Sequence, residues 1–269
     1  MKIQSYCAKF KTEGGAIVKH YEKLIELGCF TRSQLAQLLG NDASAGSMIQ
    51  EYVRKGLIER IRRDLYAVIS LETKQPIPSR YQIGSKLFPD ACISHHSAFE
   101  VFGYANQVFY ETYVSTNSRF NDFTYHDVLY HRIAFKQDTA VTHYSGVRVT
   151  TLEQTVVDSI RDFEKIGGLE ETLRCLLLIP SLNESKLLDV LKHQGNGFLY
   201  QKCGYILQEQ AGTLGLSETF FNECQKHIAH SKRYLFKDKT EQSWNAKWSL
   251  YVPPSLQRLT DKGVVDHAI

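Results

Sequence analysis

Glycines that follow short helical segments constrain the fold of this chain most strongly. Three segments in the first 60 residues place apolar side chains at helical spacing, and Gly28, Gly40 and Gly56 directly follow them. Glycine often ends helices because it adopts the left-handed backbone conformation without steric cost. Thr31 and Ser44 are suitable N-caps for the second and third segments. The pattern predicts three short helices, over residues 17–27, 32–39 and 45–55.

A β-hairpin is predicted directly after Gly56. The segments LIERI and LYAVIS have strand-like patterns and are separated by a turn at Arg63 and Asp64. Three helices followed by a two-stranded ribbon is the order of a winged helix-turn-helix, in which the third helix enters the DNA major groove.

Length and composition predict a second, larger domain. At about 150 residues per domain, 269 residues correspond to roughly two domains. Residues 70–78 are polar and contain two prolines, which favours a linker. Beyond it, strand-like segments over residues 108–135 precede a mainly helical region that starts at the N-cap Thr151. We therefore predict an α+β protein with a winged helix-turn-helix domain over residues 1–72 and a mixed α/β domain over residues 79–269.

Positive charge is concentrated near the N-terminus. The whole chain has a net charge of only +3, which does not by itself imply a nucleic-acid partner. Residues 1–69 contain 11 basic and 7 acidic side chains, whereas the remaining 200 residues contain 21 and 22. The excess charge therefore lies in the predicted winged helix, where it suits phosphate binding.

The third predicted helix has a face suited to DNA. If Ala45, Ile49, Tyr52 and Val53 are buried, the opposite face carries serine, methionine, glutamine and arginine side chains, which suit base edges, a thymine methyl group or phosphates. Arginines of the wing suit phosphates or the minor groove. The predicted DNA-binding residues are Ser44, Ser47, Met48, Gln50, Arg54, Lys55, Arg60, Arg62 and Arg63. A solvated amphipathic helix, or a winged helix that binds protein, would show the same pattern.

Other classes of protein lack their usual sequence signals. There is no signal-peptide pattern and no run of 18 apolar residues, so we expect a cytoplasmic protein. The six cysteines form no CxxC pair, and the histidines form no HExxH motif. The motifs GxGxxG, GxxxxGK[ST] and GxSxG are also absent. We expect neither a cofactor nor a metal, and no catalytic residues.

Three weaker patterns were weighed as enzyme sites. His95 and His96 have no evident nucleophile nearby and fit a helix start with one imidazole packed and one hydrogen-bonded. Asp64 with the Glu72–Lys74 segment matches a magnesium nuclease by letter, but the segment lies in the predicted linker. Gly84-Ser85 is not followed by the Asp-x-Asp pair of a nucleotidyltransferase. A non-enzyme is therefore the favoured interpretation.

Several phrases along nearly the whole chain resemble the AbiEi-type antitoxins of type IV, or abortive-infection, toxin–antitoxin systems. The phrases are GLIER with LYA (56–60 and 65–67), FPD with ISHHSA (88–90 and 93–98), and VTTLEQTVVD (149–158). Two positions depart from the family pattern, since Asp64 stands where glycine is usual and Gln154 where arginine is common.

The resemblance implies a transcriptional autorepressor that binds double-stranded DNA at inverted repeats in its own promoter. It further implies that the C-terminal domain opposes a nucleotidyltransferase-like toxin without forming a stable complex. Direct sequestration of a partner by the second domain, and a magnesium-dependent nuclease, are the alternatives from other classes.

Overall fold

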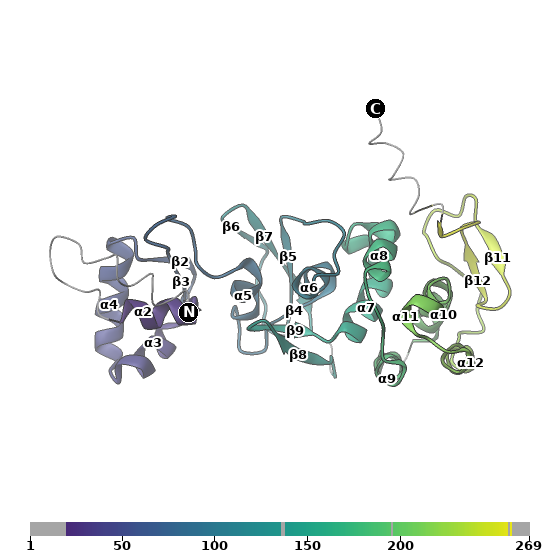
Figure 1. The fold of residues 1–269 in the computed structure, drawn as a ribbon, viewed down its shortest axis with the longest axis horizontal. Coiled ribbons are helices and arrows are strands. Elements are labelled where there is room, and N and C mark those ends of the chain that lie inside the picture. The colour runs from purple at the N-terminus through teal and green to yellow at the C-terminus, as the bar shows by residue number, and fades with distance from the viewer. Residues whose placement is uncertain (1–19, 136–137, 195, 258, 260–269) are drawn as a thin grey trace, which may run out of the picture. The chain divides into compact units, whose positions relative to one another are not determined.

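A computed structural model describes residues 20–135, 138–194, 196–257 and 259. The chain forms two compact units, with the boundary after Ile83 (Figure 1). The start of the first predicted helix, residues 17–19, lies outside the described residues. No helix among the described residues is long and apolar enough to cross a membrane.

The first unit has the element order that the sequence predicts, with one added strand. Its elements are α2 (Tyr21–Leu27), β1 (Cys29–Phe30), α3 (Arg32–Leu39), α4 (Asp42–Arg54), β2 (Ile58–Arg62) and β3 (Leu65–Val68). Strand β1, which was not predicted, pairs antiparallel with β3 and completes a sheet of order β1-β3-β2. Leu24, Phe30, Leu35 and Ile58 are buried where the helices pack on this sheet. In its described part the unit therefore has three helices and a three-stranded sheet, and the β2–β3 hairpin of this sheet is the predicted wing.

Capping residues explain where the helices of this unit begin. The Thr31 hydroxyl accepts a hydrogen bond from the Gln34 N–H, and the Gln34 side chain accepts one from the Thr31 N–H, a reciprocal capping box. Helix α4 is capped by Asn41, whose side-chain oxygen accepts from the Ser44 N–H at 3.0 Å. The prediction that Ser44 caps this helix is wrong, because the amide of Asn41 satisfies the free N–H one turn earlier.

The buried stripe of α4 is narrower than predicted. Ala45, Ile49 and Tyr52 are buried, but Val53 is 43% exposed. At 100° per residue, Val53 lies roughly 70° around the helix from the centre of that stripe. The large Tyr52 side chain fills the last core position, so Val53 remains at the edge.

The segment predicted as a linker is hydrogen-bonded to the first unit. The Ser70 N–H donates to the Gln75 carbonyl at 2.9 Å, and the Ile77 N–H donates to the Val68 carbonyl at 2.8 Å. Residues 70–78 thus form a turn against β3. The boundary between the units lies further along, within helix α5 (Arg80–Ser85).

A mixed six-stranded sheet begins the second unit. The strands are β4 (Cys92–Ile93), β5 (Glu111–Thr116), β6 (Phe123–Tyr125), β7 (Val128–Ala134), β8 (Val141–Tyr144) and β9 (Val147–Thr150), in the order β6-β7-β5-β4-β9-β8. The strands predicted over residues 108–135 are present, whereas the β8–β9 hairpin was not predicted. Helices α6 (His95–Phe102) and α7 (Leu152–Arg161) pack against each other beside this sheet.

Helices and a small sheet complete the second unit. The remaining elements are η1 (Phe163–Lys165), α8 (Gly168–Leu177), α9 (Glu184–Gln194), α10 (Gly197–Gln208), α11 (Ala211–Leu214), α12 (Glu218–Lys226), β10 (Arg233–Tyr234), β11 (Ser243–Asn245) and β12 (Leu250–Val252). Within this unit, α10 lies between α7 and the small sheet (Figure 1). Gly204 of α10 is needed there, since a Cβ atom at this position would lie 2.1 Å from the buried Trp248 ring.

Candidate nucleic-acid interface

Arg32 links α3, α4 and the turn of the wing. Its guanidinium group bonds both carboxylate oxygens of Asp42 on α4, at 2.6 and 3.1 Å. Its backbone N–H, at the start of α3, donates to the Asp64 carboxylate at 3.0 Å. Asp64 adopts the left-handed conformation, with φ of 57°, that glycine would adopt more easily. The hydrogen bond to α3 therefore gives the Asp64 side chain a structural role that a glycine at this position could not supply.

The outer face of α4 carries the predicted base-reading residues. Ser44, Ser47, Gln50 and Arg54 are exposed, and Met48 is half-buried against the core of the unit. The Ser47 hydroxyl donates to the Ala43 carbonyl at 3.2 Å, which leaves its lone pairs free to accept. Exposed hydroxyl and amide groups on one helix face can contact base edges.

The two acidic groups of α4 that lie near this face are each paired with a cation. Asp42 bonds Arg32, as described above, and the Lys55 ammonium lies 2.5 Å from the Glu51 carboxylate. The hydrogen bond from Lys55 and its charge lower the pKa of Glu51. Lys55 is therefore engaged by Glu51. Arg54 is exposed, and among the described residues no carboxylate lies within hydrogen-bond distance of it.

The arginines of the wing lie on β2 and in the turn that follows it. Arg60 and Arg63 are exposed, while Arg62 is half-buried and its pKa is lowered by burial. A bulge in β2 changes the pairing register between Arg60 and Arg62, and the Arg60 Nε donates to the Arg62 carbonyl at 3.3 Å. Arg60 and Arg63 are therefore better placed for phosphates than Arg62.

The structure brings the predicted residues together in a single unit. Helix α4 packs on β2, so both predicted DNA-contacting elements belong to the same rigid core. The contribution of Asn41, Arg32 and Asp64 to this arrangement was not predicted. Ser44 was predicted as the cap in place of Asn41, and the contacts of Arg32 join positions 10 and 32 residues apart, which no local pattern reveals.

Among the described residues, the first unit thus has three helices, α2, α3 and α4, before the β2–β3 hairpin. Residues 23–69, which span most of α2 to the end of β3, match the family described as "Transcriptional regulator, AbiEi antitoxin". The resemblance to the AbiEi antitoxins is thus confirmed for this region.

The complete fold also has a counterpart among solved structures. The crystal structure of the Rv2827c protein from Mycobacterium tuberculosis is similar over 91% of this chain and 92% of that chain, with a TM-score of 0.60 and 14% sequence identity. At this identity the similarity shows a shared fold across both units. No curated protein matches the chain.

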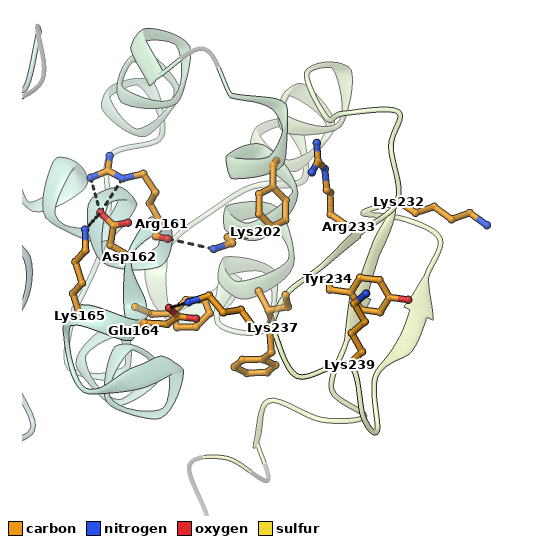
Figure 2. Close-up of a pocket in the computed structure, with 14 residues that line it drawn as sticks. Arg161, Asp162, Glu164, Lys165, Lys202, Lys232, Arg233, Tyr234, Lys237 and Lys239 are labelled. Carbon is orange, nitrogen blue, oxygen red and sulfur yellow. Dashed lines mark hydrogen bonds and ion pairs between the residues drawn. The ribbon is translucent and has the colours of Figure 1, made fainter.

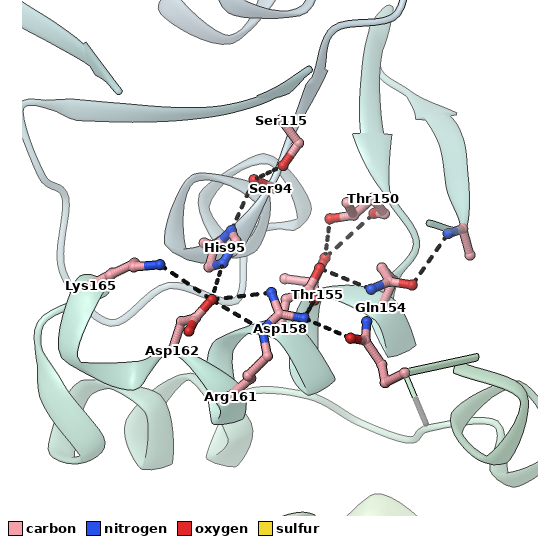
Figure 3. A network of polar contacts seen from close by, with 12 residues as sticks. Ser94, His95, Ser115, Thr150, Gln154, Thr155, Asp158, Arg161, Asp162 and Lys165 are labelled. Carbon is pink, nitrogen blue, oxygen red and sulfur yellow. Dashed lines mark hydrogen bonds and ion pairs between the residues drawn. The ribbon is translucent and has the colours of Figure 1, made fainter. Parts of the chain in front are cut away.

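The serine–histidine phrase joins a buried polar network in the second unit (Figure 3). The Ser115 hydroxyl donates to Ser94, which lies 2.9 Å from His95 Nδ1, and His95 Nε2 lies 3.5 Å from the Asp162 carboxylate. Burial would raise the pKa of Asp162, but the hydrogen bond with His95 and the charges of Arg161 and Lys165 hold it well below its usual range. The network joins β5, α6 and the end of α7.

The TLEQTVVD phrase extends the same network along α7. The Gln154 amide donates to Asp158 at 2.9 Å, and Asp158 forms an ion pair with Arg161 at 2.6 Å. Glu153 accepts a hydrogen bond from the Asn183 N–H at 3.1 Å. These contacts hold α7 in place, so Glu153 and Asp158 have a structural role.

His96 belongs to a second buried cluster, which the sequence did not reveal. His96 Nε2 lies 3.0 Å from Glu171, and the Cys175 thiol donates to the same carboxylate at 3.3 Å. These three side chains lie close enough to hold a metal ion. Burial would lower the pKa of His96, but hydrogen bonds with Cys175, Glu100 and Glu171 raise it to about 10. The neighbouring carboxylates thus favour the charged form of His96. Both adjacent histidines are hydrogen-bonded, where one was expected to be only packed.

Proposed function

We propose that this protein is the antitoxin and transcriptional autorepressor of a type IV toxin–antitoxin operon. In this proposal it acts in the cytoplasm, binds promoter DNA through α4 and the wing, and has no enzymatic activity. The match of residues 23–69 to AbiEi transcriptional regulators is the observation that carries the proposal. The exposed side chains of α4 and the exposed arginines of the wing supply suitable chemistry for a duplex.

The arrangement of charge supports a regulator that distinguishes sequences. The carboxylates of Asp42 and Glu51 are paired with cations of the same unit, which reduces their repulsion of phosphates. Gln50 and Ser47 lie on the same helix face and can accept or donate at base edges. Arg60 and Arg63 supply contacts that do not depend on sequence.

A binding experiment with the full chain tests the DNA half of this proposal. The probe is a labelled duplex containing the region upstream of the protein's own gene, with a scrambled duplex of equal length as competitor. We expect preferential binding to the upstream duplex, and repression of a reporter driven by it. Equal affinity for the two duplexes at physiological salt would contradict the regulatory role.

Co-expression with the product of the adjacent gene tests the antitoxin half. Restored growth in cells that express a nucleotidyltransferase-like toxin, without co-purification of the two proteins, is the expected result. A stable stoichiometric complex would instead favour direct sequestration of the partner. Failure to restore growth would contradict the antitoxin role and would leave the DNA-binding result standing.

A further inference from the structure

A row of aromatic side chains crosses the small sheet at the C-terminal end of the second unit. The parallel pairing of β10 with β12 aligns Tyr234 with Tyr251, and the antiparallel pairing of β11 with β12 aligns Trp244 with Tyr251. The ring centroids of Tyr234 and Tyr251 are 4.4 Å apart, and those of Tyr251 and Trp244 are 5.1 Å apart. The three rings therefore lie side by side across three strands.

This row lies on the outer face of the small sheet. Leu250 and Val252, the neighbours of Tyr251 along β12, point the other way and are buried in the core. Trp244 is 39% exposed, whereas Trp248 is 1% exposed. The Tyr234 and Tyr251 rings are nearly parallel, with an interplanar angle of 11°, so they stack on each other and leave Trp244 as the most exposed ring of the row.

Cations surround the aromatic row. The Lys232 ammonium lies 5.2 Å from the centre of the Trp244 ring, and the Lys239 ammonium lies 5.1 Å from the centre of the Tyr234 ring. Arg233, between them in sequence, lies over Phe198 of α10 at 5.8 Å. All three cations are exposed, and none forms an ion pair with another described residue. The aromatic faces thus have unneutralised positive charge beside them.

Tyr234 also lines a basic cleft of about 520 Å³ between η1, α10 and the small sheet (Figure 2). Seven of its lining side chains are cationic and two, Asp162 and Glu164, are acidic. Both carboxylates are already paired, Asp162 with Arg161 and Lys165, and Glu164 with Lys237 at 2.6 Å. The cleft therefore has a surplus of positive charge that continues toward the aromatic row.

Lys202 adds a half-buried cation to the lining of this cleft. Its ammonium donates to the Arg161 carbonyl at 3.2 Å and lies over the rings of Phe163 and Phe198, at 4.8 and 5.0 Å. Burial lowers its pKa, because the charged form has lost much of its hydration. An anion in the cleft would restore part of the lost stabilisation.

We propose that this aromatic row and cleft bind a single-stranded nucleic acid. A base stacks on the exposed ring of Trp244 at the end of the row, which Tyr251 and Tyr234 support from the side, and the phosphates contact Lys232, Arg233 and Lys239. Flat rings in a row beside cations are the features that bind unpaired bases and their backbone. A duplex hides the faces of its bases, and an acidic peptide has no flat rings in series, so neither would use the row. This site is in the second unit and does not depend on the proposed DNA binding by the first.

Fluorescence anisotropy with 12-nucleotide probes tests the proposal. The protein is the full chain with Arg60→Ala and Arg63→Ala, which weakens binding by the wing. The probes are single-stranded RNA, single-stranded DNA of the same sequence, and the matching duplex. Tighter binding of either single strand than of the duplex is expected, and the comparison of RNA with DNA identifies the kind of strand. A duplex that binds more tightly than both single strands would overturn the proposal.

Substitutions separate stacking from charge. Trp244→Ala should weaken binding about 5- to 150-fold, the equivalent of one stacked base. Lys232→Ala with Lys239→Ala should lower the slope of log affinity against log salt by about 1.4. Lys186→Ala with Lys192→Ala on α9 is the matched control, and both of these lysines are exposed. An equal loss in this control, or no loss in either test variant, would refute the site.

Tryptophan fluorescence gives a readout that a purely structural effect would not reproduce. The chain has two tryptophans, and only Trp244 is exposed. Binding of the strand should quench this emission, and Trp244→Phe should retain binding while losing the quenching. Thermal unfolding checks that each variant is folded, and if Trp244→Ala is not, the Lys232 and Lys239 variant decides. Unchanged tryptophan emission at a saturating concentration of the single strand would contradict stacking on Trp244. If inorganic polyphosphate competes as well as the single strand does, the site binds polyanions only and the proposal is overturned.

Discussion

Removal of the exposed wing arginines should flatten the salt dependence of DNA binding. Each phosphate contact contributes about 0.9 to the slope of log affinity against log salt for duplex DNA. Arg60 and Arg63 are exposed, so Arg60→Ala with Arg63→Ala should lower that slope by about 1.8. The ratio of wild-type affinity to variant affinity for the duplex should then fall about 12-fold between 50 and 200 mM salt.

The partial burial of Arg62 makes the prediction sharper. Its guanidinium group is drawn into the wing far enough for burial to lower its pKa, so it has less reach toward a phosphate. Adding Arg62→Ala to the double variant should therefore lower the slope by less than a further 0.9. Equal contributions from all three arginines would contradict this reading of the wing.

The assay is a salt titration of anisotropy with a labelled duplex. Specific and scrambled duplexes should lose affinity to a similar extent, because phosphate contacts carry no sequence information. Lys186→Ala with Lys192→Ala removes the same charge from the second unit and should leave the slope unchanged. A slope that stays at the wild-type value in the wing variant would exclude the wing from the interface, and thermal unfolding would confirm that the variant is folded.

Three further predictions concern base recognition, capping and pH. Ser47→Ala and Gln50→Ala should change the preferred base at a contacted position by about 1–3 kcal/mol, measured by competition among duplexes with single base-pair changes. Asn41→Ala should lower the free energy of unfolding by about 1 kcal/mol in urea titrations, because α4 loses its N-cap. Since hydrogen bonds with Cys175, Glu100 and Glu171 together raise the pKa of His96 from 6.5 to about 10 despite burial, the stabilisation from these contacts is complete below pH 6.5 and is lost as the pH rises toward 10. His96→Gln should remove this component of the pH dependence, and an unchanged stability profile would contradict the ion pair.

Local signals account for the accuracy of the predicted first unit. Gly28 and Gly40, which directly follow α2 and α3, both have positive φ angles. Thr31 caps α3 as expected. Strand β1 has two residues, which is too short for a periodic pattern, and its partner β3 lies far along the chain. Tertiary packing also determined that Val53 is exposed, because Tyr52 occupies the core position beside it.

The predicted interface residues differ in how far local sequence could define them. The outer face of α4 follows from helical periodicity, so the exposure of Ser47, Gln50 and Arg54 was predictable. The bulge in β2, which distinguishes Arg62 from its neighbours, could not be predicted, because it depends on pairing with β3. Charge pairing such as that of Arg32 with Asp42 requires the folded unit.

The basic site of the second unit shows why charge counted along the chain is a poor guide to binding. Residues 70–269 have a net charge of −1, yet cations from η1, α10 and β10 gather around one cleft. The aromatic row likewise depends on parallel pairing between β10 and β12, which brings Tyr234 beside Tyr251. The alternation of WSLYV (248–252) indicates β12, but no local pattern indicates its partner β10, which has only two residues. Binding depends on the local electrostatic potential and on which side chains share a surface. Long-range contacts in the folded chain determine both, so a net charge close to zero does not reveal them.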